Sequence, residues 1–176
     1  KTVVLCTDIF DEFMEANQLY ESALSDRTDE QILKQFLAAK LPKRLVSDFL
    51  VFFEAIEAPI AIRSSSLLED SQYQPFAGIY STYMIPYVND KYVMVRLLSD
   101  AVKAVYASVF YKDSKAYMYA TQNLIDQEKM AIVLQEVVGS KYDNLYYPAI
   151  SGVARSINYY PIGNEKSEEG IINMAF

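Results

Sequence analysis

The sequence predicts an α+β fold in which helices pack on a mixed or antiparallel sheet. Residues 91–110 carry apolar side chains at helical spacing, the longest such pattern in the chain. Short apolar runs at 60–62 and 131–134 are typical of buried strands. Hydrophobic residues make up 52% of the 176 residues and charged residues 22%, so we expect a globular chain with a sizeable core.

The N-terminal part is predicted to form a strand followed by helices. Residues 1–6 read as an apolar strand, and Thr7 or Asp8 is expected to cap the helix that follows. Thr28 is expected to cap a second helix, because Gln31 stands three residues later, as in a capping box.

A third helix is predicted over residues 43–56, ahead of the central strand. Its apolar positions, which we expect to be buried, are Leu45, Val46, Phe49, Phe52, Phe53 and Ile56. Pro59 marks the break into the strand at 60–62, because proline lacks an amide donor and restricts the residue before it. A second β-rich run covers residues 79–85.

The C-terminal part is predicted to alternate between helices and strands. The aromatic residues in the 91–110 helix and directly after it are expected to pack in the core or between helices, since no basic residues alternate with them as in nucleic-acid stacking surfaces. They are Tyr92, Tyr106, Phe110 and Tyr111. The elements expected after it are a helix near 113–123, a strand at 131–134, a loop at 140–147, and strands at 149–160 and 171–176 that form a hairpin-like unit.

Composition excludes several classes of function. The net charge is −7, from 23 acidic and 16 basic residues, which disfavours nucleic acid as the main partner. No apolar run approaches the roughly 18–20 residues that cross a bilayer, and no leader peptide is seen, so we expect no membrane partner and a cytoplasmic location. The chain lacks histidine, which excludes Ser-His and Cys-His nucleophile pairs and His-ligated zinc. Cys6 is the single cysteine, and we expect it to be a buried structural thiol.

One segment has the chemistry of an anion site. Arg63 ends the central strand and is followed by three serines, and a guanidinium is a rigid fork of donors that matches phosphate or carboxylate oxygens. Hydroxyls and backbone amides supply further donors. The alternative is a surface ion pair between Arg63 and Glu69 or Asp70, since structural ion pairs also cluster charges.

The ordered series Arg63-Ser64-Ser65-Ser66, Glu69-Asp70, Phe76-Ala77-Gly78 and Thr82 resembles the nucleotide-binding domain of phosphoenolpyruvate synthase and pyruvate phosphate dikinase. That domain is an ATP-grasp unit. Residues 3–8, 130–138 and 151–154 resemble other strands of the same domain, so the resemblance covers most of the chain. It implies an ATP-grasp-like nucleotide-binding domain, with about 1–125 as the first lobe and about 126–176 as the start of the second.

The resemblance also implies which residues contact ATP. Those expected at the phosphates are Arg63, Ser64, Ser65, Ala77, Gly78 and Thr82. Those expected at the adenine, in the segment that joins the lobes, are Gln135, Glu136, Val137 and Val138; an ordinary strand end with exposed polar residues is the alternative. Glu69 and Asp70 are expected to orient Arg63 or to cap the following turn, rather than to serve as an acid–base pair or as metal ligands.

As a member of this family the chain would be part of a longer protein, truncated at both ends. The resemblance places a phosphate-binding lysine before residue 1, and the Mg²⁺ ligands and a catalytic arginine after residue 176. We therefore expect no catalytic residue or metal ligand here, and no activity from this part alone. Arg155 departs from the family pattern, and a surface role and a second anion contact both stay open.

The implied reaction is that of a pyruvate, water dikinase. The β-phosphoryl of ATP passes to a phosphohistidine on another domain and then to pyruvate, which gives phosphoenolpyruvate. The partners are thus ATP and the phosphohistidine and pyruvate domains of the same protein. The alternatives are a related dikinase with another acceptor, such as an antibiotic or a glucan, and a non-catalytic module that senses nucleotides.

Overall fold

The computed structural model describes residues 1–66, 68–69, 78–120 and 128–176. The chain divides into two compact units, Lys1–Val137 (unit 1) and Val138–Phe176 (unit 2). The strand β4 (Met130–Glu136) belongs to unit 1, where it pairs with two other strands. The predicted lobes, about 1–125 and about 126–176, stay a prediction. Among the described helices, none is long and apolar enough to span a membrane.

Unit 1 contains a four-stranded sheet in the order β1-β4-β2-β3, and every strand pair in it is antiparallel. The other three strands are β1 (Thr2–Leu5), β2 (Ile60–Ser66) and β3 (Tyr83–Ile85). The predicted strand at 60–62 therefore extends to Ser66, whereas the β-rich run at 79–85 is a strand only over its last three residues. The α+β prediction with helices on an antiparallel sheet is confirmed.

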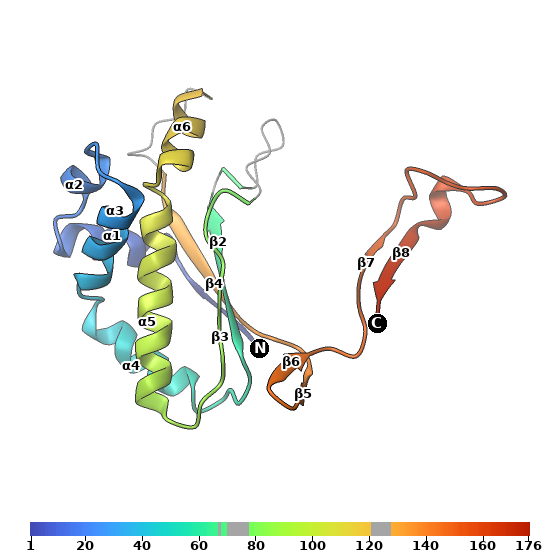
Figure 1. The fold of residues 1–176 in the computed structure, drawn as a ribbon, viewed down its shortest axis with the longest axis horizontal. Coiled ribbons are helices and arrows are strands. Elements are labelled where there is room, and N and C mark those ends of the chain that lie inside the picture. The colour runs from blue at the N-terminus through green and yellow to red at the C-terminus, as the bar shows by residue number, and fades with distance from the viewer. Residues whose placement is uncertain (67, 70–77, 121–127) are drawn as a thin grey trace. The chain divides into compact units, whose positions relative to one another are not determined.

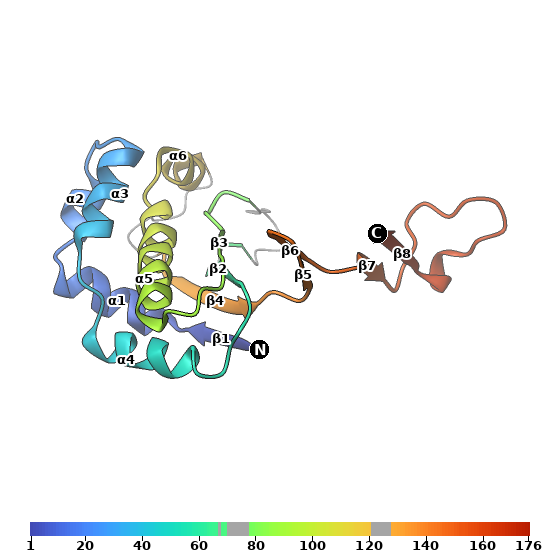
Figure 2. The same cartoon turned by 60° about the horizontal axis from the view of Figure 1, so that its bottom comes forward.

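Six described helices belong to unit 1: α1 (Thr7–Ala16), α2 (Tyr20–Leu24), α3 (Asp29–Ala38), α4 (Lys43–Phe52), α5 (Lys91–Ser108) and α6 (Lys112–Ala120). In Figure 1 and Figure 2, α1, α3 and α5 lie on one side of the sheet. The long helix α5 contacts β2, β3 and β4, so it packs across three of the four strands of the sheet.

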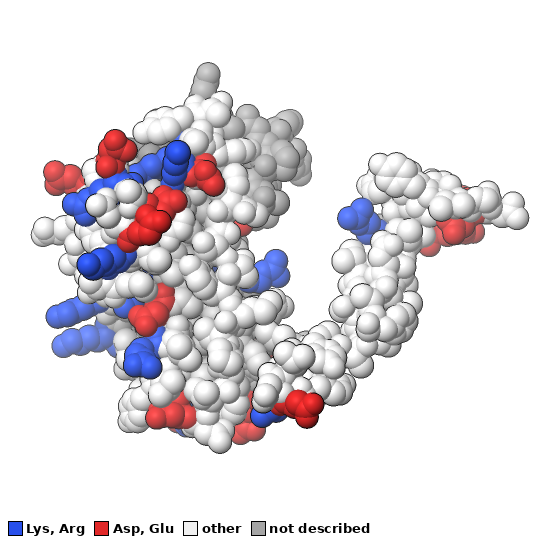
Figure 3. Space-filling model, viewed as in Figure 1, with Lys and Arg blue, Asp and Glu red and all other residues white. Residues whose placement is uncertain are grey.

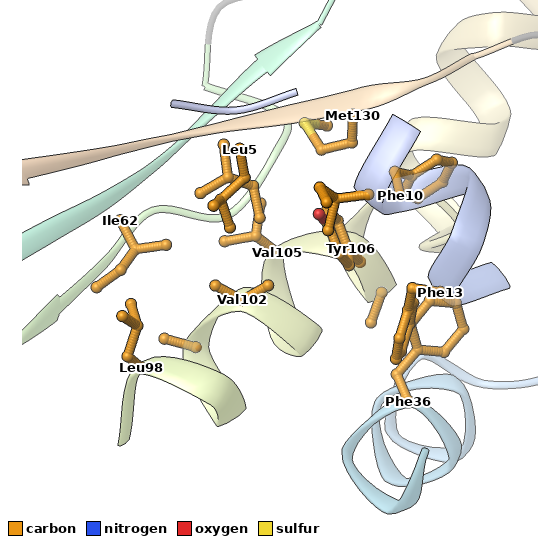
Figure 4. Packing of buried hydrophobic residues seen from close by; sticks show 14 of the residues in the cluster. Leu5, Phe10, Phe13, Phe36, Ile62, Leu98, Val102, Val105, Tyr106 and Met130 are labelled. Atoms are coloured by element: carbon orange, nitrogen blue, oxygen red, sulfur yellow. The ribbon is translucent and has the colours of Figure 1, made fainter. Parts of the chain in front are cut away.

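The core fills the space between α5 and the sheet. Ile62 of β2 faces Leu98 and Val102 of α5 in Figure 4, and all three side chains are buried. Beside them lies an aromatic cluster, in which Tyr106 contacts Phe10 and Phe13 with ring centroids 5.1 and 5.5 Å apart. Tyr106 and Phe110 are buried as predicted, whereas Tyr92 at the start of α5 is 78% exposed.

The helix boundaries confirm one local prediction and correct two others. The Thr28 side chain accepts from the Gln31 amide and the Gln31 side chain accepts from the Thr28 amide, so the capping box is present. The cap of α1 is Cys6, not Thr7 or Asp8, and it makes no side-chain hydrogen bond. Helix α4 ends at Phe52 rather than at residue 56, because the chain turns there to reach β2.

Burial predictions for α4 and for Cys6 were partly wrong. Leu45 and Phe49 face the core, but Val46 is 37% exposed and Phe52 is half-buried. Cys6 is exposed, because the strand β1 is at the edge of the sheet and the chain leaves it at this residue to begin α1. The prediction of a buried thiol is therefore incorrect.

Unit 2 consists of two hairpins. The segment 140–147, which we predicted to be a loop, forms a hairpin from β5 (Ser140–Tyr142) and β6 (Leu145–Tyr147), with the Tyr142 and Tyr147 rings stacked at 4.5 Å. The second pairs β7 (Ser151–Arg155) with β8 (Ile171–Ala175), which confirms the hairpin-like unit, and the short 3₁₀ helix η2 (Ser167–Glu169) precedes β8.

Candidate nucleotide-binding site

Arg63 extends from the face of the sheet that is turned away from the helices. Successive side chains of a strand point to opposite faces, and Ile60 and Ile62 are buried against the helices. Arg63 therefore lies on the other face, where it is exposed and stands opposite Val133 of β4. Among the described residues no hydrogen-bond acceptor or carboxylate pairs with its guanidinium.

Glu69 organises the serines that follow Arg63. Its two carboxylate oxygens accept hydrogen bonds from the Ser64 hydroxyl at 2.9 Å and from the Ser66 amide at 3.1 Å. The Glu69 amide in turn donates to the Ser66 hydroxyl at 3.4 Å. The two bonds between Ser66 and Glu69 have the reciprocal pattern of a capping box. Glu69 thus makes the contacts of a turn cap and no ion pair with Arg63 in the described part of the chain.

These residues enclose a polar pocket. Its lining is Arg63, Ser64, Ser65, Glu69 and Val133, and its volume is about 280 Å³. Whole drug-sized ligands occupy pockets of roughly 300–1,000 Å³, so this pocket has the size for a small anionic group such as one or two phosphates. The Glu69 carboxylate also lies in this lining and accepts two hydrogen bonds there, so the attraction of an anion depends on the donors of Arg63 and the serines.

The other residues expected at the phosphates lie around β3. Gly78 has a φ of +84°, a conformation that favours glycine, and a Cβ at this position would meet no atom within 4 Å. The pairing of Ile62 with Tyr83 brings Thr82, which is exposed, to the level of Arg63 on the neighbouring chain segment. Ala77 and Asp70 lie outside the described residues.

The segment expected at the adenine marks the end of unit 1. Gln135 and Glu136 are the last residues of β4, and the Val137 amide donates to the Pro59 carbonyl at 2.9 Å. Val138 is the first residue of unit 2 and is 81% exposed. The boundary between the two units thus lies within the segment expected at the adenine, and the contact of this segment with adenine stays a prediction. Gln135 lies on the same sheet face as Val133, two residues along β4.

A buried polar cluster beneath the serines was not found from the sequence. The Tyr80 hydroxyl donates to Glu128 Oε1 at 3.0 Å, and Ser66 hydrogen-bonds to the same carboxyl group. Burial raises the pKa of Glu128, although the hydrogen bonds from Ser66 and Tyr80 act in the opposite direction. Glu128 stands in a polar stretch that reads as a surface loop, so no sequence signal distinguishes it.

Charge elsewhere on the surface is mixed. Figure 3 shows positive and negative side chains side by side over the helices, without a broad area of one sign. Any anion binding at Arg63 therefore depends on the local donors. The described residues contain no group of three acidic, histidine or cysteine side chains placed to hold a metal ion. In unit 2, Arg155 is exposed on β7, and both of its expected roles stay open.

The comparison with known families decides the identity of this domain. All of residues 1–176 match the family described as "Pyruvate phosphate dikinase, AMP/ATP-binding domain". The chain belongs to this family. The resemblance inferred from the Arg63 segment is thereby confirmed. The Arg63 pocket thus lies within an AMP/ATP-binding domain.

A relative of this AMP/ATP-binding domain is found in Bacillus subtilis (strain 168). It is named "Uncharacterized phosphotransferase YvkC" and is 28% identical over 144 residues, which cover 82% of the present chain. The matched part spans 16% of the length of that relative.

Proposed function

We propose that this domain binds ATP with its phosphates at the Arg63 pocket. The observation that carries the proposal is an exposed arginine, with no partner among the described residues, that lines a polar pocket together with Ser64 and Ser65, in a chain of the AMP/ATP-binding family. A guanidinium offers paired N–H donors to phosphate oxygens and neutralises their charge. Ser65 adds a hydroxyl, and Gly78 lets the backbone approach a ligand closely.

We further propose that the adenine lies against residues 135–138. Gln135 shares the sheet face of the Arg63 pocket, and backbone groups at the end of β4 can supply the donors and acceptors that adenine needs. Because recognition through the backbone survives most side-chain changes, substitution of Glu136 or Val138 is a weak test of this part.

Magnesium ions usually accompany ATP and bind through one or two carboxylates together with phosphate oxygens. The described residues do not offer a cluster of metal ligands. The resemblance to phosphoenolpyruvate synthase implies that the metal ligands follow residue 176 in the whole protein. The residues of this domain act by positioning the phosphates and by balancing their charge, which is where most of the catalysis of phosphoryl transfer comes from.

For the whole protein we propose a dikinase of the phosphoenolpyruvate synthase type. ATP would be split so that its β-phosphoryl reaches a histidine on another domain and then pyruvate, its γ-phosphoryl reaches water or phosphate, and AMP is released. The family description names both AMP and ATP, which agrees with this stoichiometry, and the Bacillus subtilis relative is named a phosphotransferase. A cytoplasmic location is part of the same proposal.

Two alternatives keep the same nucleotide site. A related dikinase could pass phosphate to an antibiotic or a glucan, because acceptor binding belongs to another domain. A nucleotide-sensing module would bind ATP without transfer. The polar pocket at Arg63 is compatible with each, so the choice between them depends on the fate of the phosphoryl groups.

The experiment uses the full-length protein and ATP labelled separately at the β and γ positions, with the wild type beside Arg63→Ala. Label retained on the protein from the β position alone, and lost in Arg63→Ala, supports the dikinase and the role of this pocket. Retention from the γ position indicates an ordinary kinase. Binding of ATP with no retained label favours the sensing module, and no binding at all refutes the nucleotide site.

A further inference from the structure

Ser66, Tyr80 and Glu128 form a buried cluster of polar side chains. The three residues are only 5%, 5% and 6% exposed, respectively. The hydrogen bond from the Tyr80 hydroxyl to Glu128 joins residues 48 positions apart in the chain. The Ser66 hydroxyl, which has one hydrogen to donate, is placed to hydrogen-bond with either of the other two side chains, so the three form a connected network. The polar atoms of this network thus compensate one another within the protein interior.

Two members of the network belong to the chain segments of the proposed phosphate site. Ser66 is the last residue of β2, three residues after Arg63, and its amide and hydroxyl bond with Glu69 of the pocket. Tyr80 lies between Gly78 and Thr82, which are the positions expected at the phosphates on the returning segment. Glu128 therefore connects the two sides of the site from below.

The returning segment has a second attachment next to Tyr80. The Ser81 amide donates to the Ser108 hydroxyl at 3.2 Å, and that hydroxyl donates to the Val105 carbonyl at 2.7 Å. The segment that carries Thr82 is therefore held to the last turn of α5 on one side and to Glu128 on the other. Tyr80 and Glu128 can set where this segment stands relative to Arg63, although neither side chain lines the pocket.

A buried carboxyl group is costly, since it loses hydration that hydrogen bonds only partly replace. Glu128 also stands near a second carboxyl group, that of Glu69, which acts on it electrostatically. An apolar residue would satisfy packing at this point without that cost. The placement is explained if the carboxyl group is needed to join Ser66 to Tyr80.

We propose that Glu128 and Tyr80 are positioning residues that hold the two sides of the phosphate site, at Ser66 and at Gly78–Thr82, in register for a nucleoside triphosphate. The proposal rests on the proposed function, because it assumes that the Arg63 pocket receives phosphate. It assigns no contact between Glu128 and the nucleotide. The expected consequence is that loss of the network weakens binding of the phosphates and leaves binding of the nucleoside unchanged.

The test is calorimetry on the full-length protein with two probes, ATP and adenosine. Tyr80→Phe removes one hydroxyl and keeps the ring, and should weaken ATP binding about three- to tenfold, the worth of a typical hydrogen bond. Glu128→Ala should weaken it at least as much, whereas Glu128→Gln should restore it because the amide keeps an oxygen to accept from Tyr80. Adenosine affinity should not change in any variant.

The matched control is Tyr106→Phe, which also deletes one buried tyrosine hydroxyl but in the helical core, and it should leave both affinities unchanged. This inference is overturned if Tyr80→Phe and Glu128→Ala keep the wild-type ratio of ATP affinity to adenosine affinity while Arg63→Ala binds ATP more weakly. The proposed function would still stand in that case. Unchanged ATP binding in Arg63→Ala would overturn both.

Discussion

Replacement of Arg63 by alanine separates a binding role from a structural one. The Arg63 side chain is exposed and has no partner among the described residues, so its removal breaks no interaction within that part of the fold. Surface substitutions of this kind change the free energy of unfolding by about 0.5 kcal/mol or less. Arg63→Ala should therefore leave the unfolding transition nearly where it is in the wild type.

The effect on ATP binding should be much larger. Hydrogen bonds to charged groups contribute about 1.5–3 kcal/mol each, and every 1.4 kcal/mol changes Kd tenfold. One such contact from Arg63 to a phosphate thus corresponds to a loss of about 10- to 150-fold. Because Arg63 is exposed and solvent screens its charge, we expect a loss of ATP affinity in the lower part of that range. The difference in Kd between Arg63→Ala and the wild type should become smaller at high salt.

The assay is calorimetric titration with ATP beside thermal unfolding without ligand. The matched control is Arg96→Ala, which removes an exposed arginine from α5, on the helical side of unit 1, and should leave the Kd unchanged. An equal Kd for Arg63→Ala and the wild type would refute the phosphate site. A large loss of unfolding temperature in Arg63→Ala would show instead that this arginine holds the fold together.

Three further changes test the fold and the buried cluster. Tyr106→Phe should raise the free energy of unfolding by about 1 kcal/mol, because the buried Tyr106 hydroxyl has no hydrogen-bond partner in the described structure. Denaturant unfolding measures this free energy, and a lower value in Tyr106→Phe than in the wild type would contradict the reasoning. Thr28→Ala should lower the free energy of unfolding by about 1 kcal/mol and the midpoint of thermal unfolding by ~2–4 °C, because the capping box is lost. Thr28→Ser should retain both values. An unchanged midpoint in Thr28→Ala would count against a stabilising role of the cap. For Glu128, burial raises the pKa above its ordinary value of 4.5, so the folded protein keeps a proton that the unfolded chain has released, and the wild type loses stability as the pH rises from 4.5 through the raised pKa. Glu128→Gln has no such proton, so its stability relative to the wild type should increase over that interval, and parallel urea-unfolding profiles of the two proteins would show that the carboxyl group titrates normally.

The sequence alone determined what depends on near neighbours. The capping box of Thr28 needs only a partner three residues away, so it is visible in the printed sequence and present in the structure. The apolar run at 60–62 and the helical pattern at 91–110 identified the central strand and α5 in the same way. The Arg63 series, with its order and spacing, was sufficient to identify the family.

The tertiary structure decided what depends on distant parts of the chain. Cys6 follows an apolar run in the sequence, but it is exposed because β1 lies at the edge of the sheet. Which strand lies at the edge depends on how the strands pair. Glu128 reads as a surface residue, yet the fold buries its carboxyl group against Tyr80, 48 positions away. Burial and pairing of this kind are consequences of long-range contacts, which no local pattern encodes. For this reason the sequence locates the arginine of the proposed phosphate site, and only the fold shows the buried hydrogen bond between Tyr80 and Glu128 near it.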